Sequence, residues 1–194
     1  MDEKAWLKSL IKSNRSYRRF SPDVKISTQT LHELVDLGRL SASSANVQPL
    51  KYRLVTSESE REKVFPCLGW AGYIEDWQGP EEGERPAAYI VFLGDTVLAQ
   101  SFRYDAGIAV QSMLLGAAVR ELGGCIIASV KRERVREVLD IPDRYQILFV
   151  LALGKPNEEV KIDPLPPEGN IKYWRDEEGI HHVPKRPLDE IIID

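Results

Sequence analysis

Apolar residues recur along this chain with helical spacing in several separate stretches. Residues 3–13 place four large apolar side chains on one side and lysines on the other. A second helical pattern starts after Ser27 or Thr28, either of which could cap it, and runs to Gly38. Further helices are expected at 58–68, 102–122 and 131–139.

Short apolar runs between these stretches predict strands. Residues 87–93 (AAYIVFL) and 146–154 (QILFVLALG) are continuously apolar, which is typical of strands buried on both faces. Shorter extended segments are expected at 52–56 and 125–129. Helices and strands mix without a regular βαβ repetition, so the pattern favours the α+β class.

The stretch 102–122 is apolar nearly all round and contains many small residues. Such a helix should be central and buried. Its small side chains would let another backbone approach closely, including its counterpart in a second subunit. Gly123 and Gly124 are expected to stop this helix.

Residues 69–86 differ from their surroundings. Trp70, Tyr73 and Trp77 fall at helical spacing, and a Gly-, Pro- and Glu-rich run follows at 79–86. The aromatic side chains could pack as one side of a surface helix, or they could cover a planar substrate. The sequence leaves both interpretations open.

The C-terminal part has its own composition. Residues 163–167 are proline-rich and should be stiff and extended. The β-branched tail 188–194 is expected to add to a sheet. His181 and His182 lie close to Glu177 and Glu178, but the spacing fits no standard set of metal ligands, so no metal site is predicted.

Bulk properties exclude several classes of protein. The 194 residues carry a net charge of −4, which argues against a nucleic-acid or anionic-membrane partner. No apolar run is long enough to span a bilayer, and the N-terminus lacks a signal-peptide pattern. Cys67 and Cys125 form no CxxC motif and are expected to be reduced, which predicts a cytoplasmic location.

One cluster of positive charge stands out in this net-acidic chain. The basic motif, residues 14–20, holds Arg15, Ser16, Arg18 and Arg19. Guanidinium forks and a small hydroxyl suit the oxygens of a phosphate. The alternative is a solvated turn whose arginines pair with surface carboxylates.

Two other segments could complete a site for a phosphate-bearing, flat polar ring system. Ser43, Ser44, Asn46 and Gln48 offer hydroxyls and amides, and 126–129 offers backbone groups. These residues also have a simpler interpretation: Ser43, Ser44 and Asn46 could merely cap the end of the second helix. Lys185 and Arg186 could likewise be a solvated charge pair.

Five short motifs, in order, resemble those of the nitroreductase family of FMN-dependent oxidoreductases. The resemblance covers nearly the whole chain. The motifs comprise Arg15-Ser16-x-Arg18-x-Phe20, Ser43-x-x-Asn46-x-Gln48-Pro49, the long helix followed by Leu122-Gly123-Gly124-Cys125, Leu153-Gly154-Lys155-Pro156 and Lys185-Arg186-Pro187-Leu188.

The resemblance implies a central mixed or antiparallel sheet flanked by helices, in an intertwined homodimer with FMN at the subunit interface. Residues 1–160 would form the FMN-binding part, and 161–194 would be an arm of the same domain that extends over the partner. By the same resemblance, Arg15, Ser16, Lys185 and Arg186 would hold the phosphate, and Arg18 would lie near the N1/C2-carbonyl end of the flavin. The remaining cofactor contacts would be Ala42, Ser43, Ser44, Asn46 and Gln48 of the partner, with Ile127, Ala128 and Ser129 lining the ring.

The implied activity passes hydride from NADH or NADPH to FMN and then to a nitroaromatic, a quinone or another acceptor, by a ping-pong mechanism and without a catalytic side chain. Asn14 and Ala42 depart from the family pattern, where an arginine and a proline are usual. Two alternatives stay open: a specialised branch with dehalogenase, flavin-cleaving or dehydrogenase activity, and a flavin-binding or regulatory protein without turnover.

Overall fold

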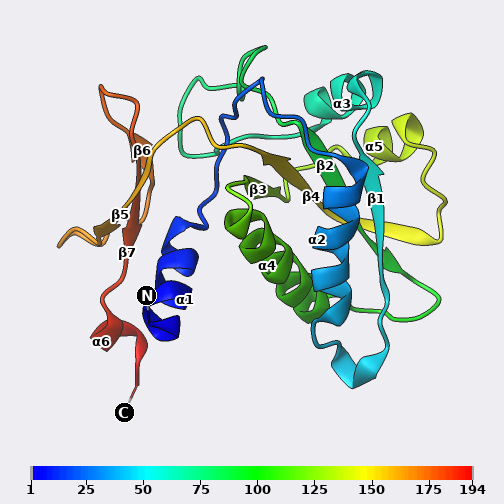
Figure 1. The fold of residues 1–194 in the computed structure, drawn as a ribbon, viewed down its shortest axis with the longest axis horizontal. Helices are drawn as coiled ribbons and strands as arrows, with labels where there is room; N and C mark the ends of the chain where they lie inside the picture. Colours follow the sequence, from blue (N-terminus) through cyan, green and yellow to red (C-terminus); the bar gives the residue numbers. More distant parts are fainter. Residues whose placement is uncertain (1, 194) are drawn as a thin grey trace.

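The computed structural model describes residues 2–193 and has two β-sheets with helices around the larger one (Figure 1). The larger sheet has the strand order β1 (Leu50–Val55), β2 (Ala88–Asp95), β4 (Tyr145–Gly154), β3 (Gly123–Ile127). All three of its strand pairs are antiparallel. The predicted α+β class is confirmed, and so is the antiparallel form of the central sheet.

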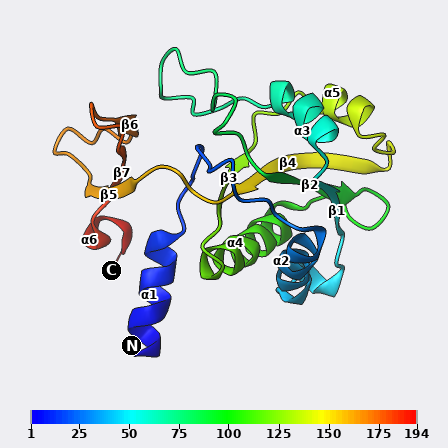
Figure 2. The ribbon, with the colours of Figure 1, turned by 45° about the horizontal axis from the view of Figure 1, so that its top comes forward.

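Helices cover both faces of this sheet. The helices α2 (Thr28–Leu40) and α4 (Arg103–Val119) lie on one face, and α3 (Glu58–Val64) and α5 (Arg132–Val138) lie on the other (Figure 2). Strand β2 shows why its sequence is continuously apolar. Tyr89 and Val91 belong to the core under α3 and α5, whereas Ile90 and Phe92 belong to the core under α2 and α4.

Most predicted helices are confirmed with small shifts of their ends. Helix α1 is Glu3–Ser13, and α2 starts where Ser27 Oγ accepts a hydrogen bond from Thr30 N at 3.0 Å. Helix α3 ends at Val64 and continues as a short 3-10 turn, η2 (Phe65–Cys67). No described helix has the length and apolar character that a membrane crossing requires.

Helix α4 is central, as expected, and within the single chain one of its faces is buried and the other is exposed. Ala109, Met113 and Ala117 face the core, whereas Tyr104 and Ile108 are exposed. The exposed face carries apolar side chains, which explains why the sequence pattern looked apolar on every side.

Two other expectations are wrong. Gly123 and Gly124 begin strand β3 instead of ending the helix, which stops at Val119. Their lack of a side chain has a steric reason: a Cβ on Gly124 would lie 2.4 Å from the carbonyl oxygen of Ala152. Residues 69–86 form turns and not a helix, because the backbone enters the left-handed region at Ala71, Asp76 and Gly79.

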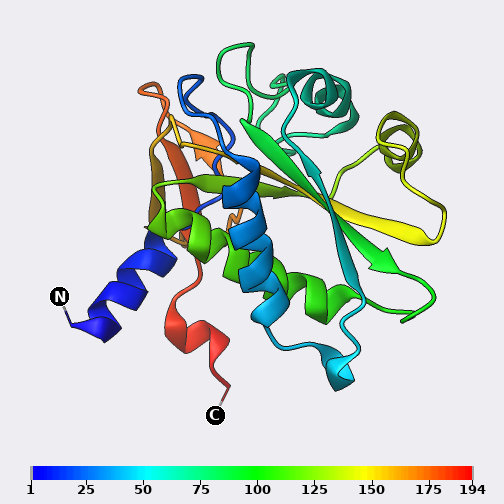
Figure 3. The same ribbon diagram turned by 45° about the vertical axis from the view of Figure 1, so that its right-hand side comes forward.

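The C-terminal part forms a small second sheet of β5 (Val160–Pro164), β7 (His181–Lys185) and β6 (Trp174–Arg175), which the sequence did not predict. This sheet lies to one side of the larger one (Figure 1). The tail was expected to add to a sheet, and this is wrong for its described residues: α6 (Leu188–Ile191) is a helix, with Asp189 and Glu190 in its first turn, where acidic side chains are favourable. Asp194 lies outside the described residues. Figure 3 shows α1 and α6 on the same side of the molecule.

Candidate functional site

The basic motif runs in extended form beside the start of strand β3. Helix α1 ends at Ser13, and the chain then pairs with β3 through a parallel bridge between Ser16 and Gly124. Tyr17 N donates to Gly124 O at 3.0 Å. Phe20 is fully buried against Gly154, where a Cβ would lie 2.6 Å from the ring. The segment is therefore not the solvated turn of the alternative interpretation, because it pairs with the edge of the sheet and holds its arginines there.

A buried carboxylate fixes this segment to the C-terminal sheet. Glu158 Oε1 accepts hydrogen bonds from the backbone N–H groups of Arg18 and, at 3.0 Å, of Arg19. Its other oxygen accepts from Arg175 Nη2 at 2.9 Å. Sequence reasoning missed Glu158, because it stands in a run of polar residues that looks like an ordinary solvated loop.

Arg18 is almost fully buried, and the groups that surround its guanidinium are neutral. Nη1 donates to Ser16 O at 3.2 Å and lies 3.3 Å from His181 Nε2. The guanidinium carbon lies 4.9 Å from the centre of the Tyr173 ring, a cation–π distance. Burial, with Arg18 as the second cause, lowers the pKa of His181 to about 4, so this imidazole is neutral at ordinary pH.

Next to Arg18 lies a cavity of about 290 Å³ between the basic motif, β3, β7 and α4. Arg15, Arg18 and Lys185 bring three cations to its lining, which contains no acidic side chain. Arg15 Nη2 donates to Ile11 O at 2.9 Å, but its buried Nε has no partner among residues 2–193. The other lining residues are Asn14, Ser16, Gln111, Leu114, Gly124, Ile126, Tyr173, His181 and Val183.

The cavity suits an anion with an attached apolar group. Its cations can hold phosphate oxygens, and the unpartnered Nε of Arg15 is a donor that such an oxygen would satisfy. Leu114 and Ile126 supply an apolar wall. Arg15, Ser16, Arg18 and Lys185, predicted from the sequence, therefore lie together. Arg186 does not join them: it is exposed and pairs with Glu190 one turn along the chain.

The predicted residues at the end of β3 lie apart from this lining. Ile127 is buried in the core under α3 and α5. The carbonyl of Ala128 accepts from Arg132 Nη2 at 3.3 Å, and that of Ser129 accepts from Gly69 N at 2.8 Å. Ser129 lines a separate cavity of about 430 Å³ with residues of the η2 turn.

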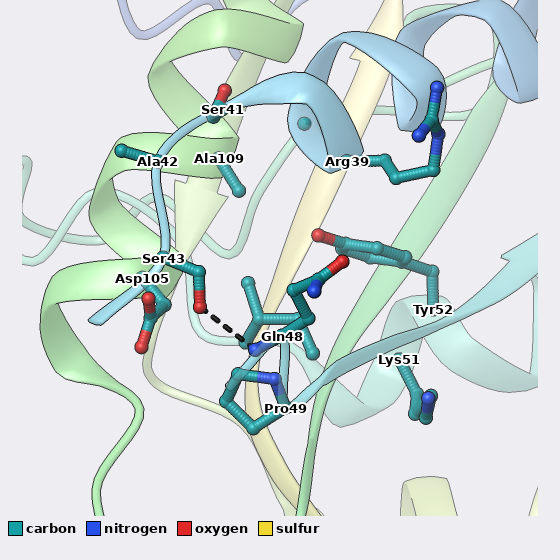
Figure 4. A pocket seen from close by; sticks show the side chains of 12 residues that line it. Arg39, Ser41, Ala42, Ser43, Gln48, Pro49, Lys51, Tyr52, Asp105 and Ala109 are labelled. Atoms are coloured by element: carbon teal, nitrogen blue, oxygen red, sulfur yellow. Dashed lines mark hydrogen bonds between the residues drawn. The ribbon is translucent and has the colours of Figure 1, made fainter. Parts of the chain in front are cut away.

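The remaining predicted residues form their own cluster around η1 (Ser44–Asn46), at the start of α4. Part of this cluster lines a cavity of about 230 Å³, which Figure 4 shows. Ser43 Oγ accepts from Gln48 N at 2.9 Å, and Gln48 Nε2 donates to Asn46 O at 3.1 Å. Ala42, Ser43 and Gln48 line the cavity.

The η1 backbone is strained and held by a buried carboxylate. Ala45, Asn46 and Gln48 have positive φ, a region that non-glycine residues rarely adopt. Asp105 Oδ1 accepts from Ser44 N at 2.7 Å, and Asp105 is 6% exposed. Sequence reasoning missed Asp105, although a lone carboxylate in a largely apolar helix could have marked it. Burial, followed by the charge of Asp105, raises the pKa of Tyr52 to about 12 in the same cavity.

Within one chain the two groups of predicted residues are separated by about half the length of α4. The η1 cluster meets this helix at Asp105, whereas the basic cavity meets it at Gln111 and Leu114. With a rise of 1.5 Å per residue, Asp105 and Leu114 lie roughly 13 Å apart along the axis. In Figure 1 the basic motif follows α1 on one side of α4, whereas η1 follows the far end of α2 on the other side.

The aromatic residues of 69–86 divide between packing and the site. Trp70 is buried, and its ring centre lies 5.7 Å from that of Phe65 and 6.5 Å from that of Trp77. These rings are part of the core, not a helix face. Tyr73 instead contacts Tyr173, with ring centres 5.0 Å apart, and so touches the group that surrounds Arg18.

The two histidines of β7 have different surroundings. His181 faces Arg18, whereas His182 Nδ1 lies 2.7 Å from Asp163 Oδ2 and its Nε2 lies 3.0 Å from Asp176 Oδ2. Hydrogen bonds to Asp176 and Asp163 raise the pKa of His182. Within residues 2–193 no group of three or more His, Cys, Asp or Glu side chains is arranged to hold a metal ion.

Comparison with known proteins identifies the relatives of this chain. The Nitroreductase family matches residues 11–155. NADPH-flavin oxidoreductase of Vibrio harveyi is 26% identical over 171 residues, which cover 79% of this chain and 67% of that protein. A solved NADPH:FMN oxidoreductase from Vibrio harveyi, complexed with NAD+, has a TM-score of 0.64 at 26% identity, covering 83% of this chain and 74% of that one. A nitroreductase family protein from Streptococcus pneumoniae shares the fold with a TM-score of 0.69 at 19% identity, covering 97% of this chain and 99% of that one.

Proposed function

The chain belongs to the nitroreductase family, and from that premise we propose that it is an FMN-dependent NAD(P)H oxidoreductase that reduces a nitroaromatic, a quinone or a similar acceptor. One observation carries the proposal. The cavity beside β3 is lined by Arg15, Arg18 and Lys185 and by no acidic side chain. In a chain with net charge −4, such a lining favours an anionic ligand. The relatives with NADPH-flavin and NADPH:FMN activity in their names support FMN as that ligand.

In this proposal Arg15, Ser16 and Lys185 hold the phosphate, with Arg186 able to join after it leaves Glu190. When bound, FMN supplies the redox chemistry by accepting electrons from NAD(P)H and passing them to the acceptor. The protein binds and orients the reactants, and Arg18 contributes a fixed positive charge near the ring. The neutral His181 and the Tyr173 face hold Arg18 without taking part in proton transfer.

We propose a homodimer in which the η1 cluster completes the partner's basic cavity. The cavity in one chain, about 290 Å³, is just below the roughly 300–1,000 Å³ that small-molecule sites occupy. The chain exposes 11789 Å², whereas a compact monomer of its mass exposes roughly 9,300 Å². Apolar side chains on α1, α4 and α6 contribute to that surface, among them Trp6, Tyr104 and Ile191.

Three further points stay predictions. The first is that residues 1–160 form the FMN-binding part and residues 161–194 form an arm over the partner subunit, which presupposes the proposed dimer. The ping-pong order requires that NAD(P)H and acceptor use one site in turn. A cytoplasmic location is supported by the two cysteines, which are both buried and free.

Anaerobic spectroscopy tests the proposal. The purified protein should bind FMN in a saturable titration, NADH or NADPH should bleach the flavin absorbance, and a nitroaromatic or a quinone should restore it. Initial rates at several acceptor concentrations should give parallel double-reciprocal lines. Protein that binds FMN but is reduced by neither nucleotide would favour the non-catalytic alternative, and protein that binds no FMN would overturn the proposal.

A further inference from the structure

The charge of Arg18 is not neutralised by the groups that hold it. The carboxylate of Glu158 does not bind the Arg18 guanidinium. It accepts hydrogen bonds from the backbone N–H groups of Arg18 and Arg19 and from the Arg175 side chain. No ion pair within residues 2–193 includes the Arg18 guanidinium. Its partners are a carbonyl, an imidazole and an aromatic face.

The contact with His181 fixes the tautomer of that histidine. A guanidinium has only donors, so the Nε2 atom at 3.3 Å from Arg18 Nη1 must present its lone pair. The proton of the neutral ring is therefore on Nδ1. His181 is 1% exposed and its Nδ1 has no hydrogen-bond partner among the described residues. The low pKa of His181 agrees with a ring that stays neutral.

We propose that His181 is a positioning residue that holds the Arg18 guanidinium beside the basic cavity while leaving its positive charge uncompensated. A carboxylate in the same place would hold Arg18 at least as firmly, but it would cancel the charge. A neutral acceptor orients the cation without that loss. Residue 181, which belongs to β7 of the C-terminal sheet, thus sets the electrostatic potential of the cavity through Arg18.

The consequence for the cofactor rests on the proposed function. Negative charge gathers on a flavin when it is reduced, and an uncompensated cation nearby stabilises it. His181→Gln keeps a neutral acceptor and should leave the midpoint potential of bound FMN close to that of the wild type. His181→Glu keeps an acceptor but adds a negative charge, so it should shift the midpoint potential to more negative values and weaken FMN binding by about tenfold.

Two measurements test the inference, and the first needs no cofactor. Long-range ¹⁵N NMR of the FMN-free protein distinguishes the nitrogens of its three histidines. The His181 signals, assigned by comparison with His181→Gln, should show a protonated Nδ1 and an unprotonated Nε2. A His181 ring with its proton on Nε2 would overturn the inference, whatever the protein binds.

The second measurement is spectroelectrochemical titration of FMN bound to the wild type, His181→Gln and His181→Glu, with thermal melting to confirm that each is folded. A negative shift in His181→Glu alone supports the inference. Equal potentials in all three proteins, or equal shifts in both variants, would overturn it. If the wild type binds no FMN, the proposed function fails, and the NMR result still decides whether His181 presents a neutral acceptor to Arg18.

Discussion

The carboxylate of Glu158 and the guanidinium of Arg175 form a buried ion pair, with Nη2 and Oε2 2.9 Å apart. Their side chains are 3% and 11% exposed. Glu158 follows the last strand of the larger sheet, and Arg175 belongs to β6 of the smaller one. The pair therefore joins the two sheets next to Arg18.

Removal of Glu158 should be costly, because it leaves the Arg175 charge and two backbone N–H groups without their acceptor. We expect Glu158→Ala to lower the free energy of unfolding by about 3 kcal/mol. Urea unfolding followed by fluorescence measures this change. Glu159→Ala is the matched control, since Glu159 is exposed and its contact with Lys161 is 3.8 Å. Equal effects of the two substitutions would contradict the role of Glu158.

Stability should also depend on the charge of His182, which bridges Asp163 of β5 and Asp176 before β7. Its pKa is raised above the ordinary 6.5, so its contribution is complete below pH 6.5 and is lost as pH rises through the raised pKa. The pKa of Asp176 is lowered from 3.8, mainly by His182, so its contribution is lost as pH falls through that lowered value. His181 and the Trp174 ring, stacked on His182 at 4.8 Å, carry no compensating charge at these pH values.

Urea midpoints at about pH 6 and about pH 9 test this dependence, because the interval crosses the titration of a histidine with a raised pKa. The wild type should lose more stability over the interval than His182→Gln, in which nothing titrates at this position. The same loss in both proteins would show that the charge of His182 does not stabilise the C-terminal sheet.

Asn14 lines the basic cavity at the position where the family motif usually has an arginine. Asn14→Arg adds a fourth cation to the lining, so we expect FMN to bind about tenfold more tightly. Fluorescence titration with FMN measures the affinity. Asn170→Arg adds the same charge at an exposed loop position and should leave the affinity unchanged. A tighter affinity in both variants would point to net charge and not to the cavity.

The proposed dimer predicts complementation between two defective chains. Arg15→Gln damages the basic cavity, and Asn46→Ala damages the η1 cluster that should complete the partner's cavity. In a mixed dimer, one site combines both defects, and the other has an intact cavity and an intact η1 cluster. Co-expressed chains with different tags should therefore bind about half as much FMN as the wild-type dimer. Mixed dimers that bind none would show that the site does not combine these two regions of different chains.

Gly124 should tolerate no side chain, because a Cβ there would lie 2.4 Å from the Ala152 carbonyl oxygen, which is fixed in the sheet. We expect Gly124→Ala to destabilise the protein by about 1–3 kcal/mol and to disturb the adjacent basic motif. Thermal unfolding measures the first effect. Gly72→Ala is the control, because no atom lies within 4 Å of the Cβ it would add. Comparable losses would remove the steric argument.

Local patterns in the sequence predicted most of the elements. The continuous apolar runs identified β2 and β4, because a strand covered on both faces has no polar side to show. Ser27 marked the start of α2 by its capping chemistry. The charge of the basic motif predicted an anion site, and the structure brings Arg15, Ser16, Arg18 and Lys185 to one cavity.

What the sequence alone determined, then, is the set of elements, the α+β class and the chemical character of the site. The tertiary structure decided which distant residues meet: Arg18 contacts Glu158 and His181 across 140 and 163 positions of the chain. It also decided that the tail forms α6, that Trp70 packs in the core, and that the η1 cluster lies away from the basic motif. Secondary-structure propensity and hydrophobic periodicity act over a few neighbouring residues, whereas these contacts join residues far apart in the chain and depend on the complete tertiary fold.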